Sequence, residues 1–326
     1  MPHEPVDEMG FPALVSVSSL MSIAHLFGTS KKRCGIYFFV FKSGFFYIGQ
    51  AVDVVRRFSQ HRRIHDDIVG FSFIPMAKSR LDHEEKTMIF RAESLGLKIT
   101  NVVHVANIVG DTDFDLVVSV AKQDAWLCAP TRGGNSGSIN QKITLPEIQK
   151  IRFTKNFSRF EKHPLSDRAL ALFKSYLWSC VPAPRHTEYS FWSVSCMPSG
   201  SGTWPRLLCV SAAVMELFVV GWEKNNPNVL WSFINVAEDV LFEYWSSLDE
   251  LLKAFPFIEI VRTGYRDAGQ HQISLQTYGG APMEQLLTDP GISKAAAVLA
   301  LRVMRKRATI YGKYHCVELA NRALLG

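Results

Sequence analysis

Residues 35–49 read GIYFFVFKSGFFYIG, two apolar runs joined by a short Lys-Ser-Gly turn. Aromatic and β-branched residues fill 35–41 at nearly every position, which predicts a strand that is buried on both faces. The turn permits a tight reversal into a second strand from Phe45. The stretch therefore predicts a hairpin at the centre of a sheet. Its Tyr37 and Tyr47 each carry a hydroxyl that a buried site must pair or use.

A first helix is expected directly after the hairpin. Asp53 is a natural N-cap for a helix that runs to about Arg62. On this helix Arg57 lies one turn before His61, so the two side chains are expected to be neighbours. The helix thus adds a permanent cation and a titratable imidazole to the two tyrosines.

A second helix is expected to begin at Ser79, because the sequence to Asp82 resembles a capping box with aspartate in the place of glutamate. It is expected to end at Gly96. Glu85 falls inside the apolar stripe of this helix, whereas Glu84 falls at its margin. A buried charge needs a partner or a metal ion, so Glu85 is expected to have one or the other.

Taken in order, these residues resemble the GIY-YIG endonuclease superfamily. The resemblance extends over about residues 33–102 and depends on Gly35, Ile36, Tyr37, Tyr47, Ile48, Gly49, Arg57, His61, Glu85 and Asn101. It implies a small α/β module with a central antiparallel sheet flanked by helices. It further implies five catalytic residues, Tyr37, Tyr47, Arg57, His61 and Glu85, and three residues of structural importance, Gly35, Gly49 and Asn101.

The resemblance implies hydrolysis of a phosphodiester bond with one divalent metal ion, Mg²⁺ or Mn²⁺. Glu85 is the implied metal ligand, and Arg57 is expected to clamp a phosphate oxygen. Tyr37 is implied to orient or deprotonate the attacking water, with Tyr47 or His61 supporting the proton transfer. A phenol has an unperturbed pKa of roughly 10, so this role at neutral pH needs nearby cations.

Composition sets the limits for the rest of the chain. Its 326 residues are 47% apolar and 20% charged, a globular profile with room for two domains. The sequence has no run of eighteen apolar residues and no basic segment before the apolar stretch 13–26, so we expect a cytoplasmic protein without a membrane span. The six cysteines form no C-x-x-C pair, which argues against a zinc knuckle or a small disulfide scaffold.

The basic residues are concentrated in two parts of the chain. Residues 31–98 hold 13 lysines and arginines against 7 acidic residues, and residues 129–326 hold 22 against 16. Basic surfaces in both halves suit a polyanion such as DNA. The candidate nucleic-acid contacts are Arg56, Arg62, Arg63, Arg302, Arg305, Lys306 and Arg307. For 302–313 a solvated helix end with cations near its C-terminus is an equally favoured interpretation.

The predicted fold class is α+β, with two domains. Pro130–Ser138 is dense in turn residues, so we predict a nuclease domain over 1–129, a linker over 130–145 and a second α+β domain over 146–326. In the first domain, helices are also expected at 15–27 and 116–127, and a strand at 71–75. In the second, strands are expected at 190–196, 206–212, 216–222, 229–235, 257–263 and 271–277, and helices at 247–255, 282–287, 292–307 and 317–325.

His315 stands beside Cys316 without a third residue to orient the pair. Adjacent residues generally face apart, so a surface histidine and a packed core cysteine are expected.

The sequence therefore predicts a metal-dependent endonuclease joined to a domain that selects the target or a partner. DNA is the expected substrate, with RNA left open, and a prokaryotic enzyme of restriction or phage-defence type is favoured. A homodimer or a partner protein bound through the second domain is also open. The alternative is a nucleic-acid-binding or scaffold protein that retains the nuclease fold without turnover. The intact set of tyrosine, arginine, histidine and glutamate side chains argues against it.

Overall fold

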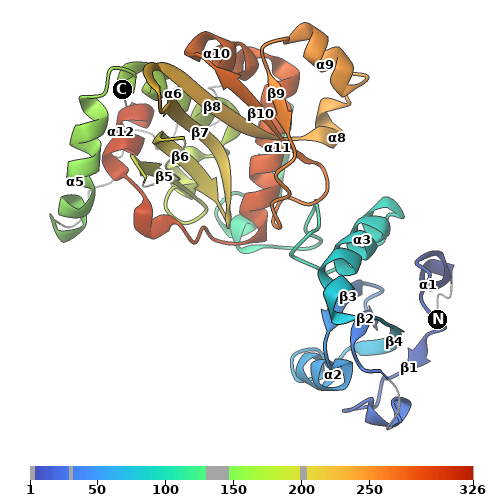
Figure 1. The fold of residues 1–326 in the computed structure, drawn as a ribbon. Helices are drawn as coiled ribbons and strands as arrows, with labels where there is room; N and C mark the ends of the chain where they lie inside the picture. Colours follow the sequence, from blue (N-terminus) through green and yellow to red (C-terminus); the bar gives the residue numbers. More distant parts are fainter. Residues whose placement is uncertain (1–3, 29–31, 130–146, 199–203, 326) are drawn as a thin grey trace. The chain divides into compact units, whose positions relative to one another are not determined.

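The computed structural model describes residues 4–28, 32–129, 147–198 and 204–325. These residues form two compact units, Met1–Gly110 and Asp111–Gly326, each described below by itself (Figure 1). The described residues contain twelve α-helices and two antiparallel sheets of four and six strands. The predicted α+β fold class is therefore confirmed.

The first unit is built on a four-stranded sheet in the order β1-β4-β2-β3. Its elements are α1 (Glu4–Glu8), β1 (Val15–Ser16), β2 (Gly35–Phe41), β3 (Phe46–Ala51), α2 (Val54–Arg62), β4 (Ile68–Pro75) and α3 (Leu81–Ser94). Strands β2 and β3 form the predicted hairpin, with Tyr37 opposite Gly49. All seven residues of β2 are buried, as expected for an inner strand covered on both faces. Strand β3 lies at the free edge of the sheet.

The two faces of this sheet are covered by different helices. Alternate residues of β2 point to opposite faces. Tyr37 and Phe39 pack with Phe58 of α2 on one face, whereas Phe38 packs with Ile89 of α3 on the other. The hairpin is thus held between two helices, and α2 and α3 approach it from opposite sides.

Three local predictions for this unit have clear outcomes. The Asp53 carboxylate accepts hydrogen bonds from the N–H groups of Val55 and Arg56, which confirms the cap of α2. The predicted cap of the next helix is wrong, because Ser79 lies in a 3₁₀ turn and α3 begins at Leu81 without a side-chain cap. The helix predicted at 15–27 is also wrong. Strand β1 and a 3₁₀ turn at 24–26 occupy that segment, because Val15 pairs with Phe71 at the edge of the sheet.

The second unit is built on a six-stranded sheet in the order β5-β6-β7-β8-β10-β9. Its strands are β5 (Trp192–Cys196), β6 (Arg206–Ala212), β7 (Met215–Glu223), β8 (Asn226–Ala237), β9 (Glu259–Val261) and β10 (Gln272–Tyr278). Its helices are α4 (Val120–Cys128), α5 (Glu147–Glu161), α6 (Ser166–Cys180), α7 (Pro184–Thr187), α8 (Glu238–Leu241), α9 (Leu248–Ala254), α10 (Gly280–Thr288), α11 (Pro290–Lys306) and α12 (Val317–Leu325). The six predicted strands and four predicted helices of this region are all present, whereas α5, α6, α7 and α8 were not predicted.

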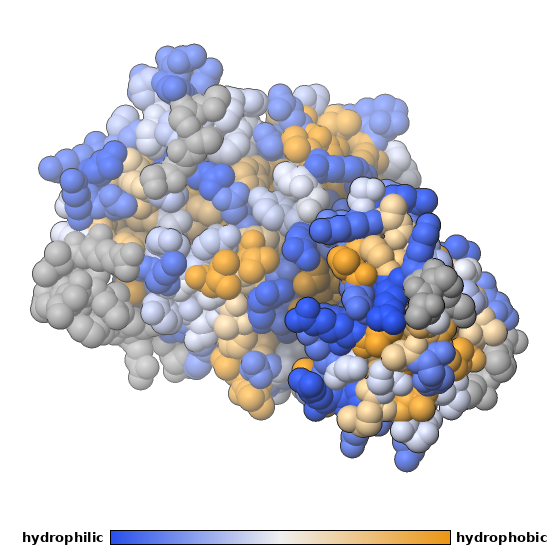
Figure 2. All heavy atoms as spheres, turned by 60° about the horizontal axis from the view of Figure 1, so that its bottom comes forward, coloured by the Kyte–Doolittle hydropathy of each residue, from blue (hydrophilic) through white to orange (hydrophobic). Residues whose placement is uncertain are grey.

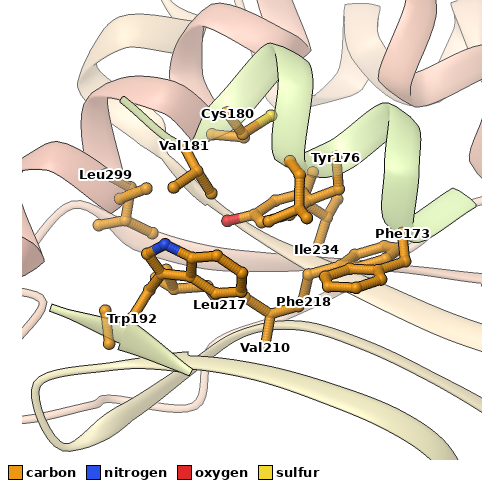
Figure 3. Close-up of a cluster of buried hydrophobic side chains, with 14 of the residues drawn as sticks. Phe173, Tyr176, Cys180, Val181, Trp192, Val210, Leu217, Phe218, Ile234 and Leu299 are labelled. Atoms are coloured by element: carbon orange, nitrogen blue, oxygen red, sulfur yellow. The ribbon is translucent and has the colours of Figure 1, made fainter. Parts of the chain in front are cut away.

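Aromatic residues join α6 to the sheet in the core of the second unit. The rings of Tyr176 and Phe218 are stacked, with centroids 4.8 Å apart and planes 6° from parallel. Figure 3 shows this pair together with Phe173 and Trp192 between α6 and the strands. The indole of Trp192 is fully buried and donates a hydrogen bond to the carbonyl of Pro184 (2.8 Å), so it serves the core.

The boundary between the compact units differs from the predicted boundary. It falls between Gly110 and Asp111, because Phe114, Val118 and Trp126 pack in the core of the second unit. The segment predicted as one helix at 116–127 forms a 3₁₀ turn followed by α4. The predicted linker at 130–145 lies outside the described residues.

His315 is buried, so the surface position expected for it is wrong. Its Nε2 lies 2.9 Å from Glu188 Oε1, and its Nδ1 accepts a hydrogen bond from the N–H of Val194 (3.0 Å). Glu188 also pairs with the buried Arg185. This network fixes the segment before α12 against β5 in the core, where each polar side chain needs a partner.

Within the described residues, no helix is both long enough and apolar enough to cross a membrane. Figure 2 shows hydrophilic and hydrophobic residues intermixed over the visible surface.

The position of Phe114 provides a test of the boundary. Its side chain is fully buried, and its ring meets that of Phe191 at 4.9 Å in an edge-to-face contact. In the fragment 111–326 we expect Phe114→Ala to lower the free energy of unfolding by about 3–5 kcal/mol. Val117→Ala, at an exposed neighbour, should change it by about 0.5 kcal/mol or less. Urea unfolding measures both, and equal small effects would show that this segment does not belong to the second unit.

Candidate active site

The hydroxyl of Tyr37 is the centre of the candidate site. It lies 3.0 Å from His61 Nε2, and it accepts a hydrogen bond from Arg57 Nε at 3.3 Å. Tyr37 comes from the buried strand β2, and both of its partners come from α2. The one-turn spacing of Arg57 and His61 therefore brings both groups to the same phenol, as the sequence predicts.

Tyr47 lies beside this group on the neighbouring strand. Its ring centroid lies 5.0 Å from that of His61, and the two rings are tilted. The centroids of Tyr47 and Tyr37 are 6.1 Å apart, and these two rings are stacked. Four of the five predicted catalytic residues thus gather on the face of the sheet that α2 covers.

At the two signature glycines, a larger residue would clash with neighbouring atoms. Gly49 lies opposite Tyr37 in the hairpin, and a Cβ atom at Gly49 would clash with the Tyr37 hydroxyl. A Cβ atom at Gly35 would clash with the main-chain carbonyl of Ile74 on β4. Gly49 therefore leaves space for the Tyr37 hydroxyl, and Gly35 allows β2 and β4 to pair closely.

The outer edge of β3 is closed by three separate contacts. The main chain of Phe46 pairs with that of Lys98 and Thr100. Asn101 uses its amide on both polar groups of Ile48: Oδ1 accepts from the N–H (3.1 Å) and Nδ2 donates to the carbonyl (2.7 Å). Asn101 thus replaces a missing neighbouring strand, which gives its predicted structural importance a physical basis.

Glu85 makes the third of these edge contacts. Its Oε1 accepts from the N–H of Gln50 (3.2 Å), and its Oε2 accepts from Gln50 Nε2 (3.0 Å). Glu84 instead pairs with Arg80 one turn earlier on α3. The predicted helix phase is confirmed, because Glu85 faces the sheet and Glu84 does not.

Glu85 reaches β3 from the side of α3, whereas Tyr37, Arg57 and His61 lie on the side of α2. β3 is the edge strand of the sheet (Figure 1), so side chains from either face can reach its outer edge. Their electrostatic coupling appears at Tyr47. Burial raises the pKa of this phenol, the charge of Arg57 opposes that shift, and the charge of Glu85 adds to it.

The acid–base properties of the site favour neutral groups around Arg57. Burial raises the pKa of Tyr37 well above its ordinary value, Tyr47 adds to this shift, and Arg57 opposes it. The pKa of His61 falls from 6.5 to about 4, because burial disfavours the imidazolium and the charges of Arg57 and His65 repel it. The hydrogen bond to Tyr37 raises the pKa of Arg57. At neutral pH the site therefore combines a neutral phenol, a neutral imidazole and a guanidinium cation.

The residues present suit one divalent metal ion with few protein ligands. Among the described residues, no group of three or more histidine, cysteine, aspartate or glutamate side chains gathers as a metal site. Glu85 offers a carboxylate at the sheet edge, and Asp82 lies within the same hydrogen-bond network through Gln50. Mg²⁺ commonly binds through one or two carboxylates and keeps several waters, which matches this donor set.

Gln50 is the residue of the site that the sequence analysis missed. It directly follows the second signature, and strand alternation places it on the same face as Ile48, toward α3. The alternation of β3 could therefore have predicted that Gln50 faces α3 and Glu85.

The predicted nucleic-acid contacts on α2 divide into two classes. Arg56 and Arg63 are exposed, as that prediction requires. For Arg62 the predicted contact with nucleic acid is wrong. Its side chain is buried, and its guanidinium donates to four main-chain carbonyls, those of Val17, Leu20, Asp66 and Ile68. It links the N-terminal arm to the sheet and is not available for phosphate.

The four basic residues near the end of α11 are paired with acidic residues or buried. Arg302 forms a two-pronged ion pair with Asp239, and Arg307 forms one with Asp267. Arg305 pairs with Asp115, and Lys306 is buried. The three arginines are paired with acidic residues of the second unit, so they are less available to phosphate than the sequence predicts.

Comparison of the chain with protein-family models, with curated proteins and with solved structures finds no match. The functional assignment therefore depends on the residues of the site and their geometry.

The depressed pKa of His61 leads to a direct measurement. In NMR titrations of labelled histidine we expect His61 to remain neutral at pH 7 and to protonate with a midpoint of about 4. Because the unfolded chain binds this proton near pH 6.5, stability should fall as the pH drops from about 6.5 to 4. Arg57→Gln should raise the midpoint, since it removes a repelling charge. A midpoint at or above 6.5 in the native protein would contradict the half-buried position of the ring near Arg57.

Arg62 and its neighbour Arg63 form a matched pair for separating stability from binding. Arg62→Met should lower the free energy of unfolding by about 3 kcal/mol or more, because it leaves buried carbonyls without donors. Arg63→Met should change stability by about 0.5 kcal/mol or less. Denaturant unfolding of both variants tests the assignment. Similar small effects would return Arg62 to the candidate DNA contacts.

Proposed function

We propose that the first unit is a metal-dependent endonuclease that hydrolyses phosphodiester bonds of DNA. The observation that carries the proposal is the Tyr37 hydroxyl, which is shared by Arg57 and His61 beside the edge strand that Glu85 binds. Together, a phenol, a cation, an imidazole and a carboxylate can orient a water molecule, stabilise developing charge and bind a metal ion, which phosphodiester hydrolysis uses. Their order and spacing resemble those of GIY-YIG endonucleases.

Glu85, with Asp82 nearby, would hold one divalent cation, Mg²⁺ or Mn²⁺, which when bound withdraws charge from the scissile phosphate. Arg57 supplies a permanent positive charge beside Tyr37, and it can donate to a phosphate oxygen as negative charge develops there. Tyr37 orients the attacking water through its hydroxyl. Neutral His61, with its own proton on Nδ1, accepts a hydrogen bond from the phenol at Nε2, which leaves the lone pairs of the phenol oxygen for Arg57 and the attacking water.

This arrangement gives the two supporting residues different tasks. His61 lies within hydrogen-bond distance of the Tyr37 hydroxyl and, being neutral, can accept from it. Tyr47 packs against both rings, and its hydroxyl interacts with the side chains of Tyr37 and Arg57. His61 is thus the imidazole partner of Tyr37, and Tyr47 is its phenolic partner.

The second unit is proposed to select the target or to bind a partner, in a cytoplasmic enzyme of restriction or phage-defence type. All six cysteines are free thiols, which suits a reducing compartment. The alternative, a nucleic-acid-binding or scaffold protein without turnover, predicts DNA binding without cleavage.

A plasmid-nicking assay separates these two functions. Supercoiled DNA should be cut with Mg²⁺ or Mn²⁺ and left intact with EDTA. Glu85→Gln should lower the cleavage rate by about 100-fold or more, because it removes charge that would hold the metal ion. Glu84→Gln is the matched control, since Glu84 pairs with Arg80 away from the sheet edge, and its rate should stay close to that of the native protein. Metal-independent cutting, or equal rates for the two variants, would contradict the proposal.

A further inference from the structure

Gln50 holds both oxygens of the Glu85 carboxylate. Its main-chain N–H donates to Oε1 at 3.2 Å, and its side-chain Nε2 donates to Oε2 at 3.0 Å. One donor belongs to the main chain of the edge strand, and the other belongs to a half-buried side chain. Two donors from one residue fix both the position and the plane of the carboxylate.

The same amide also binds a second carboxylate. Gln50 Nε2 donates to Asp82 Oδ1 at 2.6 Å, and Asp82 lies three residues before Glu85 on α3. Residues at this spacing share one helix face. The amide nitrogen therefore lies between two carboxylate oxygens, and it supplies them with hydrogen-bond donors but no net charge.

We propose that Gln50 is the positioning residue for the Glu85 metal ligand. The main-chain N–H holds Oε1 at the sheet edge, and the side-chain amide orients Oε2, the oxygen that would bind the metal ion. This inference depends on the proposed function, because it takes Glu85 as the metal ligand.

The chemistry of glutamine suits this task. Its amide carries an oxygen on the same planar group as the nitrogen, so a residue that donates to a free carboxylate can turn its oxygen toward a cation. A lysine here would also donate to both carboxylates, but its ammonium would repel a metal ion. Partners that orient a metal-binding carboxylate typically affect metal affinity by about 10–100-fold.

The competing explanation is that Gln50 only packs α3 against β3. The two explanations differ in metal affinity. If Gln50 is a packing residue, its replacement changes stability and leaves Mn²⁺ binding unaffected. If it positions Glu85, its replacement weakens Mn²⁺ binding even where the fold is preserved.

The test uses the full chain, with Mn²⁺ as the probe and electron paramagnetic resonance of free Mn²⁺ as the readout. Gln50→Met, which fills a similar volume without a donor, should weaken Mn²⁺ binding by roughly 10–100-fold. Gln50→Lys should retain the melting temperature, because it keeps donors for Asp82 and Glu85, and yet it should lose Mn²⁺ binding. Glu84→Gln should bind Mn²⁺ as the native protein does.

The outcomes separate this inference from the proposed function. If the native protein binds no Mn²⁺ and cleaves no DNA, the proposed function fails and the inference fails with it. If the native protein binds Mn²⁺ and Glu85→Gln abolishes binding, but Gln50→Met or a folded Gln50→Lys binds as tightly as the native protein, only the role of Gln50 is overturned. Should Gln50→Met fail to fold, the Gln50→Lys variant alone decides the matter.

Discussion

The free edge of β3 is the constraint on which the candidate site depends. An edge strand exposes N–H and carbonyl groups that must be satisfied. Here the donors and acceptors come from the site itself: Asn101 pairs with Ile48, and Glu85 pairs with Gln50. A contact that completes the sheet thereby fixes the carboxylate at the boundary between its two faces. Glu85 and the tyrosines come from opposite faces, and the edge strand is where both can be reached.

The electrostatics of the tyrosine cluster favour a neutral ground state. Burial raises the pKa of Tyr37 and lowers that of His61, so neither residue is ionised near pH 7. Arg57 is the one charge in direct contact with the phenol, and it acts to stabilise a phenolate. A second cation held at Glu85 would act in the same direction on Tyr47, whose pKa the bare carboxylate raises. The side chains alone therefore place neutral groups around Arg57, and the proposed reactivity of the site would depend on a cation at the sheet edge.

Periodicity predicted most of the fold and of the site. The hairpin, the Asp53 cap, the phase of Glu85 and the strands of the second unit followed from local patterns that the structure retains. The errors arose where tertiary contacts overrode local propensity. The apolar segment 15–27 reads as a helix, but pairing of Val15 with Phe71 makes it an edge strand and a turn. Phe114 and Trp126 precede a turn-rich segment, yet they bury themselves in the second core, and no local signal reveals which core an apolar residue will join.

The sequence also does not reveal which lysines and arginines are paired with acidic residues in the folded protein. A count of lysines and arginines does not distinguish a free cation from one that is paired inside the protein. Arg302, Arg305 and Arg307 each have an acidic partner, whereas Arg56 and Arg63 are exposed on or beside the helix that carries Arg57 and His61. Electrostatic attraction to a phosphate backbone depends on cations that can release counterions, and a paired arginine releases few. In the proposed function, the exposed cations Arg56 and Arg63 would therefore attract a polyanion to the first unit more strongly than the paired arginines of α11 would attract it to the second.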